Sequence, residues 1–272
     1  NIVVLENIYR HLGQAGNQAK ARLNAALVGV REVWPAVLAS PPGPELLEGQ
    51  GVADEIISYD KRGEARGPRS VLALAGALRA LRVDAALIPH RSFRSALIAW
   101  LARIPIRIGF DESGGRLLLT RTVRYRARAH EVERVAGLAE ALGIELSAGR
   151  VPFRLRTPEG AEEALASELA RRGVGSGERL VLVAPGSRWT TKRWPGRRFA
   201  AAGAALAGRL DASVALIGSA QDAAACAEVE SRMSSRAINL CGALSLGQTI
   251  ALADRASLLL SNDSAAAHIG AG

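Results

Sequence analysis

The sequence has few cysteines, few aromatic residues and no long hydrophobic run. Its two cysteines, Cys226 and Cys241, offer no metal-binding spacing; they fit a reducing compartment and the role of small apolar filler. The most apolar segment, residues 95–108, is broken by arginines and a proline, so no run approaches the roughly 20 residues that cross a bilayer. No signal peptide is recognisable either. These absences indicate a cytoplasmic protein without a transmembrane helix.

Lysine is scarce as well. The net charge is +9, but only three of the 35 cationic residues are lysines. A basic surface can attract nucleic acid, anionic lipid or phosphorylated small molecules. Aromatic residues make up only 4% and the arginines are scattered rather than clustered in one run, which argues against nucleic acid. Lys192, surrounded by arginines, indicates a site that requires a compact point charge.

Short apolar runs alternate with amphipathic segments along the chain, a pattern typical of parallel sheets covered by helices. Strands are predicted over residues 2–5, 36–39, 55–59, 85–89, 106–110, 180–184, 213–217 and 258–261. Helices are predicted over residues 19–33, 71–81, 93–102, 130–142, 161–172, 197–209 and 223–233. We therefore expect an α/β protein with doubly wound parallel sheets.

The segment 149–158 contains two prolines and no helical periodicity, and it predicts a domain boundary. We place one α/β domain at residues 1–152 and a second at residues 153–272, and expect a ligand cleft where the two face each other. The chain has no initiator Met and stops at Gly272, early in a predicted helix. The second domain is therefore expected to be incomplete.

Residues 183–195, V-A-P-G-S-R-W-T-T-K-R-W-P, join a buried strand to a helix. Such loops lie at the carboxyl edge of a parallel sheet, where doubly wound proteins bind ligands. Ser187, Thr190, Thr191 and Lys192 offer hydroxyls and an ammonium group beside backbone N–H groups. The loop therefore predicts a phosphate site, although it matches neither a P-loop nor a G-x-G-x-x-G pattern. The alternative is that both tryptophans pack and the polar groups cap the loop.

Two further segments follow predicted strands. In the first, S-N-D-S-A-A-A-H, either Asp263 or Ser264 is expected to cap a new helix that faces the same anion, with His268 one turn further on. An ordinary helix cap and a buried histidine are the simpler interpretation. In the second, I-G-S-A-Q-D, Asp222 lies beyond a strand end, a position from which an acid can hold ribose hydroxyls.

These motifs resemble those of the heptosyltransferases, glycosyltransferase family 9. The resemblance rests on V-A-P-G-S-R-W-T-T-K-R-W-P-x-x-x-F, I-G-S-A-Q-D, L-C-G-A-L-S-L and S-N-D-S-A-A-A-H-I, and it extends more generally to the first half of the chain. It implies a GT-B architecture of two Rossmann-like domains, with the acceptor on the first and the nucleotide sugar on the second. It also implies inverting transfer of a heptose from ADP-heptose to the lipopolysaccharide inner core, with neither cofactor nor metal.

Carried over by motif, Ser187, Thr190, Thr191 and Lys192 would contact the diphosphate and Asp222 the ribose. Asp263, Ser264 and His268 would lie on the donor side, and Lys192 would also assist catalysis. The implied partners are a nucleotide-sugar donor, a lipid-linked or phosphorylated saccharide acceptor and an anionic membrane surface, but not nucleic acid. The implied location is the cytoplasm, peripherally on the inner face of the inner membrane.

One position departs from the family pattern, which has Gly-Asp soon after the first strand, with the aspartate as general base. One alignment places Tyr9-Arg10 there, and the other places Gly16-Asn17 there, so that Asn17 stands where the base is expected. Neither supplies a carboxylate, and an amide cannot accept the proton of the acceptor hydroxyl. Ala265, where the family usually has Gly, is a smaller departure.

Two other functions therefore stay open at this point. A catalytically degenerate protein could bind the nucleotide sugar without transferring it. A nucleotide-binding oxidoreductase or ligase could share the same alternation of strands and helices, although the chain has no dinucleotide fingerprint. Binding and turnover of ADP-heptose, measured separately, distinguish the first two functions, and binding of NAD would support the third.

Overall fold

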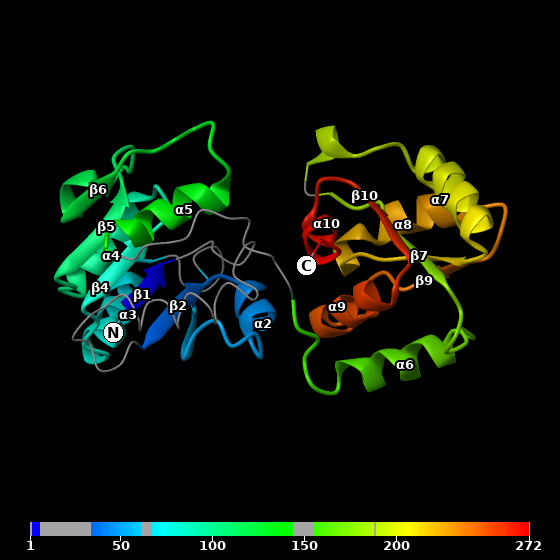
Figure 1. Ribbon diagram of the computed structural model, residues 1–272, viewed down its shortest axis with the longest axis horizontal. Coiled ribbons are helices and arrows are strands. Elements are labelled where there is room, and N and C mark those ends of the chain that lie inside the picture. Colours follow the sequence, from blue (N-terminus) through cyan, green and yellow to red (C-terminus); the bar gives the residue numbers. More distant parts are fainter. Residues whose placement is uncertain (1, 6–33, 61–66, 144–154, 188, 272) are drawn as a thin grey trace. The chain divides into compact units, whose positions relative to one another are not determined.

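The computed structural model of the chain describes residues 2–5, 34–60, 67–143, 155–187 and 189–271 (Figure 1). Its internal contacts divide the chain into two compact units, Asn1–Phe153 and Arg154–Gly272. Each unit contains one parallel sheet with helices on its faces, which confirms the predicted α/β class. In the part of the chain so described, no helix is long and apolar enough to cross a membrane.

The sheet of the first unit has six parallel strands in the order β3-β2-β1-β4-β5-β6, the strand order of a Rossmann fold. The strands are β1 (Ile2–Leu5), β2 (Pro35–Ala39), β3 (Glu55–Ser58), β4 (Ala85–Ile88), β5 (Ile106–Phe110) and β6 (Arg121–Val123). The helices are α2 (Gly43–Leu47), α3 (Pro68–Ala80), α4 (Phe93–Leu101) and α5 (Glu131–Glu140), with the short 3-10 turn η1 (Arg116–Leu118).

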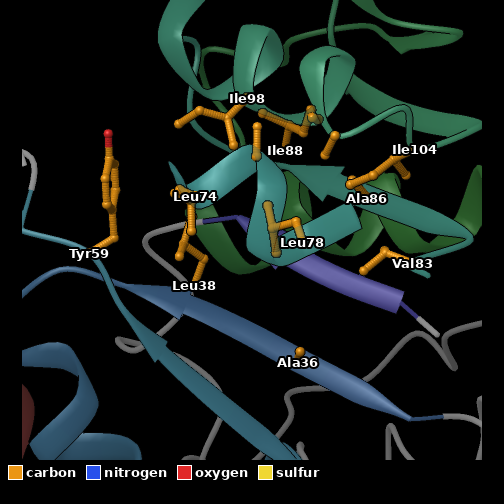
Figure 2. Close-up of a cluster of buried hydrophobic side chains, with 13 residues drawn as sticks. Ala36, Leu38, Tyr59, Leu74, Leu78, Val83, Ala86, Ile88, Ile98 and Ile104 are labelled. Atoms are coloured by element: carbon orange, nitrogen blue, oxygen red, sulfur yellow. The ribbon is translucent and has the colours of Figure 1, made fainter. Parts of the chain in front are cut away.

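Side chains of β2 alternate between the two faces of this sheet, as the two-residue period of a strand requires. Ala36 and Leu38 join a buried cluster formed by β4, α3 and α4, whereas Val37 and Ala39 pack with α2. Figure 2 shows the first cluster, with side chains of both helices and of the sheet in one apolar layer. Leu87 of β4 faces the opposite way, toward a cluster that includes α5.

The sheet of the second unit has four parallel strands in the order β10-β7-β8-β9. The strands are β7 (Leu180–Ala184), β8 (Ser213–Leu216), β9 (Ala237–Asn239) and β10 (Leu258–Ser261). The helices are α6 (Ala161–Arg171), α7 (Gly196–Leu210), α8 (Ala223–Glu230), α9 (Leu246–Arg255) and α10 (Ala265–Ile269), with 3-10 turns η2 (Thr190–Lys192) and η3 (Ala220–Asp222).

Strand β7 is buried on both faces, which explains why its sequence is a continuous apolar run. Leu180 and Leu182 pack with α6 and α9, while Val181 and Val183 pack with α7 and α8. Cys226 of α8 is fully buried in the cluster that contains Val181 and Val183, and Cys241 packs against the same cluster, as expected for small apolar filler. Burial raises the pKa of both thiols, so both stay protonated at neutral pH.

All eight predicted strands are present, and six of the predicted helices are found within two or three residues of their expected ends. The seventh, residues 19–33, lies outside the described residues, as does most of the segment 149–158. Strands β6 and β9 were not predicted because each has only three residues and no apolar run. Helix α9 was also missed, although Ser245 and Gln248 form a capping box that marks its start.

Candidate functional site

The order of the second sheet brings the three sequence-predicted segments to one edge. From β7 the chain continues to β8 on one side, while β10 lies on the other side of β7, so the strand order reverses between β7 and β10. Doubly wound sheets bind ligands at the carboxyl ends of the strands beside such a reversal. The loops that follow β7, β8 and β10 all begin at this edge and together form the candidate site.

Asn262, directly after β10, fastens the loop that follows β7. Its Nδ2 donates to the carbonyl oxygens of Pro185, at 2.8 Å, and Gly186, at 3.3 Å, and its Oδ1 accepts from the N–H of Trp194 at 3.0 Å. The side chain thus holds both ends of the loop, and Asn262 is only 8% exposed. The sequence pattern did not predict this role, although Asn262 lies within the motif S-N-D-S-A-A-A-H.

Lys192 lies at the end of η2, and its ammonium group donates to Oδ2 of Asp263 at 2.5 Å. Both side chains remain at least half exposed to solvent. The two residues come from the loops after β7 and β10, so this ion pair joins the two loops a second time. Because the pair is open to solvent, a ligand phosphate can reach the ammonium group at a small cost, since exposed ion pairs contribute about 1 kcal/mol or less.

Arg193 has a different role from its neighbour. Its Nε donates to the backbone oxygen of Ser187 at 2.9 Å and so closes the loop on itself. The loop also contains the backbone hydrogen bond from Lys192 N to Trp189 O, at 3.0 Å. Trp194 packs edge-on against Phe199 of α7, with ring centroids 5.2 Å apart. The arginine and this tryptophan therefore shape the loop, while the ammonium group of the lysine is half exposed beside Asp263.

The predicted hydroxyls differ in their surroundings. Ser187 is buried, directly after Pro185-Gly186. Thr191 is exposed in η2. Thr190 begins the same turn, and its side chain lies outside the described part of the structure.

Asp222, the expected ribose ligand, links the loops that follow β7 and β8. Its Oδ2 accepts from the N–H of Ser219 at 2.9 Å and from its hydroxyl at 2.7 Å, which completes a capping box at η3. Its Oδ1 lies so close to Gly186 that an added Cβ there would be 2.2 Å away. A Cβ on Gly218 would lie 2.9 Å from the Cβ of Asp222. Both glycines are therefore needed for the carboxylate to occupy this position.

The helix after β10 begins as expected, but without the expected side-chain cap. Ser264 occupies the N-cap position of α10, yet its hydroxyl makes no capping hydrogen bond. Oδ2 of Asp263 accepts a hydrogen bond from Lys192. His268 lies within α10 and is partly buried.

The expected catalytic position is in the first unit. Asn17 lies outside the described residues, as do residues 6–33 generally. The strand order of the first sheet reverses between β1 and β4, so the loops after these two strands mark its equivalent edge. Arg94, at the start of α4, donates to the hydroxyl of Tyr59, which follows β3, and its guanidinium lies 5.3 Å from the centre of the tyrosine ring. The sequence pattern did not predict this pair, because its residues are 35 positions apart.

The chain is similar in sequence to a known family and to two curated proteins. The sequence model of glycosyltransferase family 9 (heptosyltransferase) matches residues 71–272. Lipopolysaccharide heptosyltransferase 2 of Salmonella typhimurium is 30% identical over 210 residues, which cover 73% of this chain and 59% of that protein. Its namesake in Escherichia coli K12 is 30% identical over 207 residues, with the same coverage of both chains. The chain thus spans about three-fifths of the length of these curated relatives.

Solved structures show the same fold. A family 9 glycosyltransferase from Veillonella parvula has a TM-score of 0.81 at 23% identity, covering 99% of this chain and 76% of that one. The ADP-heptose lipopolysaccharide heptosyltransferase II of E. coli has a TM-score of 0.77 at 24% identity, covering 99% and 81%. An E. coli heptosyltransferase solved with ADP has a TM-score of 0.71 at 15% identity, covering 99% and 83%.

Proposed function

Because the chain belongs to glycosyltransferase family 9, the heptosyltransferases, we propose that it transfers a heptose from ADP-heptose to a saccharide acceptor of the lipopolysaccharide inner core. The observation that carries this proposal is the assembly of the loops after β7, β8 and β10 at one sheet edge, held by Asn262, Lys192 and Asp222. The names of the relatives support the donor and the pathway. Family membership favours an enzyme over a protein that only binds the nucleotide sugar.

In the proposed reaction, an acceptor hydroxyl attacks the anomeric carbon of the heptose. A new glycosidic C–O bond forms on one face while the bond to the diphosphate oxygen breaks on the other, so the configuration inverts and ADP leaves. Negative charge develops on the departing diphosphate. Lys192, released from Asp263, and the hydroxyls of Ser187, Thr190 and Thr191 would stabilise that charge. We propose that these groups suffice without a metal ion.

The remaining proposed contacts follow from placing the diphosphate beside Lys192. Asp222 would hold the ribose once the nucleotide lies along the loop after β8, and Ser264 and His268 would face the donor from α10. The acceptor would meet the first unit. The proton of its hydroxyl must leave during attack, and Asn17, which one of the two alignments puts in place of the family's aspartate, cannot take it. Glu6, a nearby carboxylate in the sequence, would then accept that proton.

The test separates donor binding from transfer. Calorimetry with ADP measures binding, and mass spectrometry of an inner-core acceptor lacking the heptose measures transfer from ADP-heptose, with and without EDTA. We expect ADP binding, and transfer that EDTA leaves unchanged. Binding of NAD in preference to ADP would refute the proposal. Transfer that stops with EDTA would refute metal independence alone.

The base is tested by Asn17→Asp. A positioned general base contributes about 10²–10⁴-fold, so we expect turnover to rise within that range while ADP affinity stays the same, because the donor loops belong to the other unit. If the wild-type chain already turns over as fast as the variant, another group accepts the proton. If ADP binds but neither protein transfers heptose, the chain is a binding protein rather than an enzyme.

A further inference from the structure

The candidate donor site contains two carboxylates whose charges are balanced in different ways. Asp222 accepts from the N–H and the hydroxyl of Ser219, so its charge is balanced by groups of its own loop. Asp263 accepts from the ammonium group of Lys192 at 2.5 Å, and this group comes from a different loop. Because we expect Lys192 to meet the diphosphate of the ligand, a phosphate that binds the ammonium group takes the place of Asp263.

The backbone of Asp263 is held in place from both sides. Its neighbour Asn262 is buried and bonds to two carbonyls and one N–H of the loop that follows β7. Ser264, on the other side, is the N-cap residue of α10. Rotation of the side chain can therefore move the carboxylate of Asp263 only a short distance. A displaced carboxylate stays close to Lys192, where its negative charge repels the phosphate that replaced it.

The ion pair between Lys192 and Asp263 can be exchanged at low cost. The two side chains are 50% and 66% exposed, respectively. An ion pair this open to solvent changes an equilibrium by about fivefold at most. The loop that carries Lys192 does not depend on the pair for its shape, because Asn262 and Arg193 hold it separately. A phosphate can thus replace the carboxylate on binding, and the carboxylate can replace the phosphate on release.

The proposed reaction changes the charge of the phosphate that competes with Asp263. When the bond between the anomeric carbon and the diphosphate oxygen breaks, its electron pair stays on that oxygen. The terminal phosphate of ADP therefore carries about one more negative charge at neutral pH than the same phosphate in the nucleotide sugar. A nearby exposed carboxylate repels one added charge by about fivefold in affinity. Repulsion from Asp263 thus weakens the binding of ADP more than that of the donor.

We propose that Asp263 is an exchangeable counter-ion of Lys192, which promotes the release of ADP and makes the site prefer the nucleotide sugar over ADP. Asp263 is a positioning residue in this role, because it acts through Lys192 and need not touch the reacting atoms. The inference rests on the proposed function, since it requires an adenosine diphosphate group beside Lys192. It concerns the second unit alone and does not depend on which group accepts the acceptor's proton.

Calorimetry with two probes tests this role. The probes are ADP and its β-methyl ester, which has the same nucleotide but one negative charge less. In Asp263→Asn both should bind about fivefold more tightly, because no carboxylate competes for Lys192, and ADP should gain about fivefold more, because the repulsion is also lost. Asp254→Asn is the matched control: it removes an exposed carboxylate from the end of α9, near the start of β10 at the opposite sheet edge, and should leave both affinities unchanged.

The same substitution in a Lys192→Ala background separates the two effects. The gain shared by both probes should disappear there, since no ammonium group is left to release, while the extra gain of ADP over its ester should remain. A purely structural role of Asp263 would instead weaken both probes alike. If wild-type chain binds no ADP, the proposed function itself is refuted. If ADP binds but Asp263→Asn does not tighten it, or tightens both probes equally, the role in ADP release is overturned alone.

Discussion

Replacement of Asn262 tests whether one side chain holds the candidate donor site together. In the folded chain its amide makes three hydrogen bonds, of 2.8, 3.0 and 3.3 Å, to the two ends of the loop that follows β7. The orientation of the amide is fixed by its partners, because the N–H of Trp194 can only donate and the carbonyls of Pro185 and Gly186 can only accept. Removing the side chain therefore breaks all three bonds.

The expected loss can be worked out from these contacts. Each of the two shorter hydrogen bonds contributes about 1 kcal/mol net and the longest contributes less, and the buried carbonyl of Pro185 loses its partner. Asn262→Ala should thus lower the free energy of unfolding by about 2–3 kcal/mol. Asn262→Asp should lower it further at neutral pH, since the introduced carboxylate faces two carbonyl oxygens, and part of that loss should be recovered when acid protonates it.

Denaturant unfolding measures the stability of these variants, and calorimetry measures their affinity for ADP. We expect ADP affinity to fall about tenfold in Asn262→Ala, because the loop must then be ordered by the ligand itself. Ser213→Ala is the matched control. It removes a hydrogen bond to Glu178 at the amino end of β8, far along the strands from the site, and should lower stability without changing ADP affinity. Wild-type stability and affinity in Asn262→Asp would refute this account of the loop.

Three further predictions concern the same unit. Lys192→Ala should weaken ADP binding by roughly tenfold to a hundredfold with little change in melting temperature, whereas Arg193→Ala should mainly lower the melting temperature, because its guanidinium holds a backbone carbonyl. Equal effects of the two substitutions on ADP affinity and on melting temperature would contradict these separate roles. Gly186→Ala should destabilise the unit because its Cβ would meet Asp222, and Asp222→Ala in the same chain should restore part of the melting temperature; additive losses would contradict the contact. Hydrogen bonds from a hydroxyl and a backbone N–H lower the pKa of Glu178 from its ordinary value of 4.5, so its contribution to stability is present above that pH and is lost as pH falls through the lowered pKa. Melting temperatures from pH 6 down to about pH 3 should consequently fall less steeply in Glu178→Gln than in the wild type.

The sequence by itself determined the class of fold and the position of most strands. Strand β7 is the clearest case: five consecutive apolar residues bounded by Pro185-Gly186 predicted a short buried strand, and residues 180–184 form one. The same local logic located the loops after β8 and β10. It failed for β6 and β9, which are short and gain their pairing from neighbouring strands rather than from a pattern of their own.

Only the tertiary structure decided how the residues of these loops divide their work. Lys192 and Arg193 are adjacent cations in sequence, yet one pairs with Asp263 across the strand reversal and the other closes its own loop. Asn262 and Gly186 are 76 residues apart, and their hydrogen bond exists only because β10 lies beside β7. Periodicity and turn chemistry act over a few residues, so they place a loop. The pairing of strands distant in the chain sets what each side chain touches, and hence what it can do.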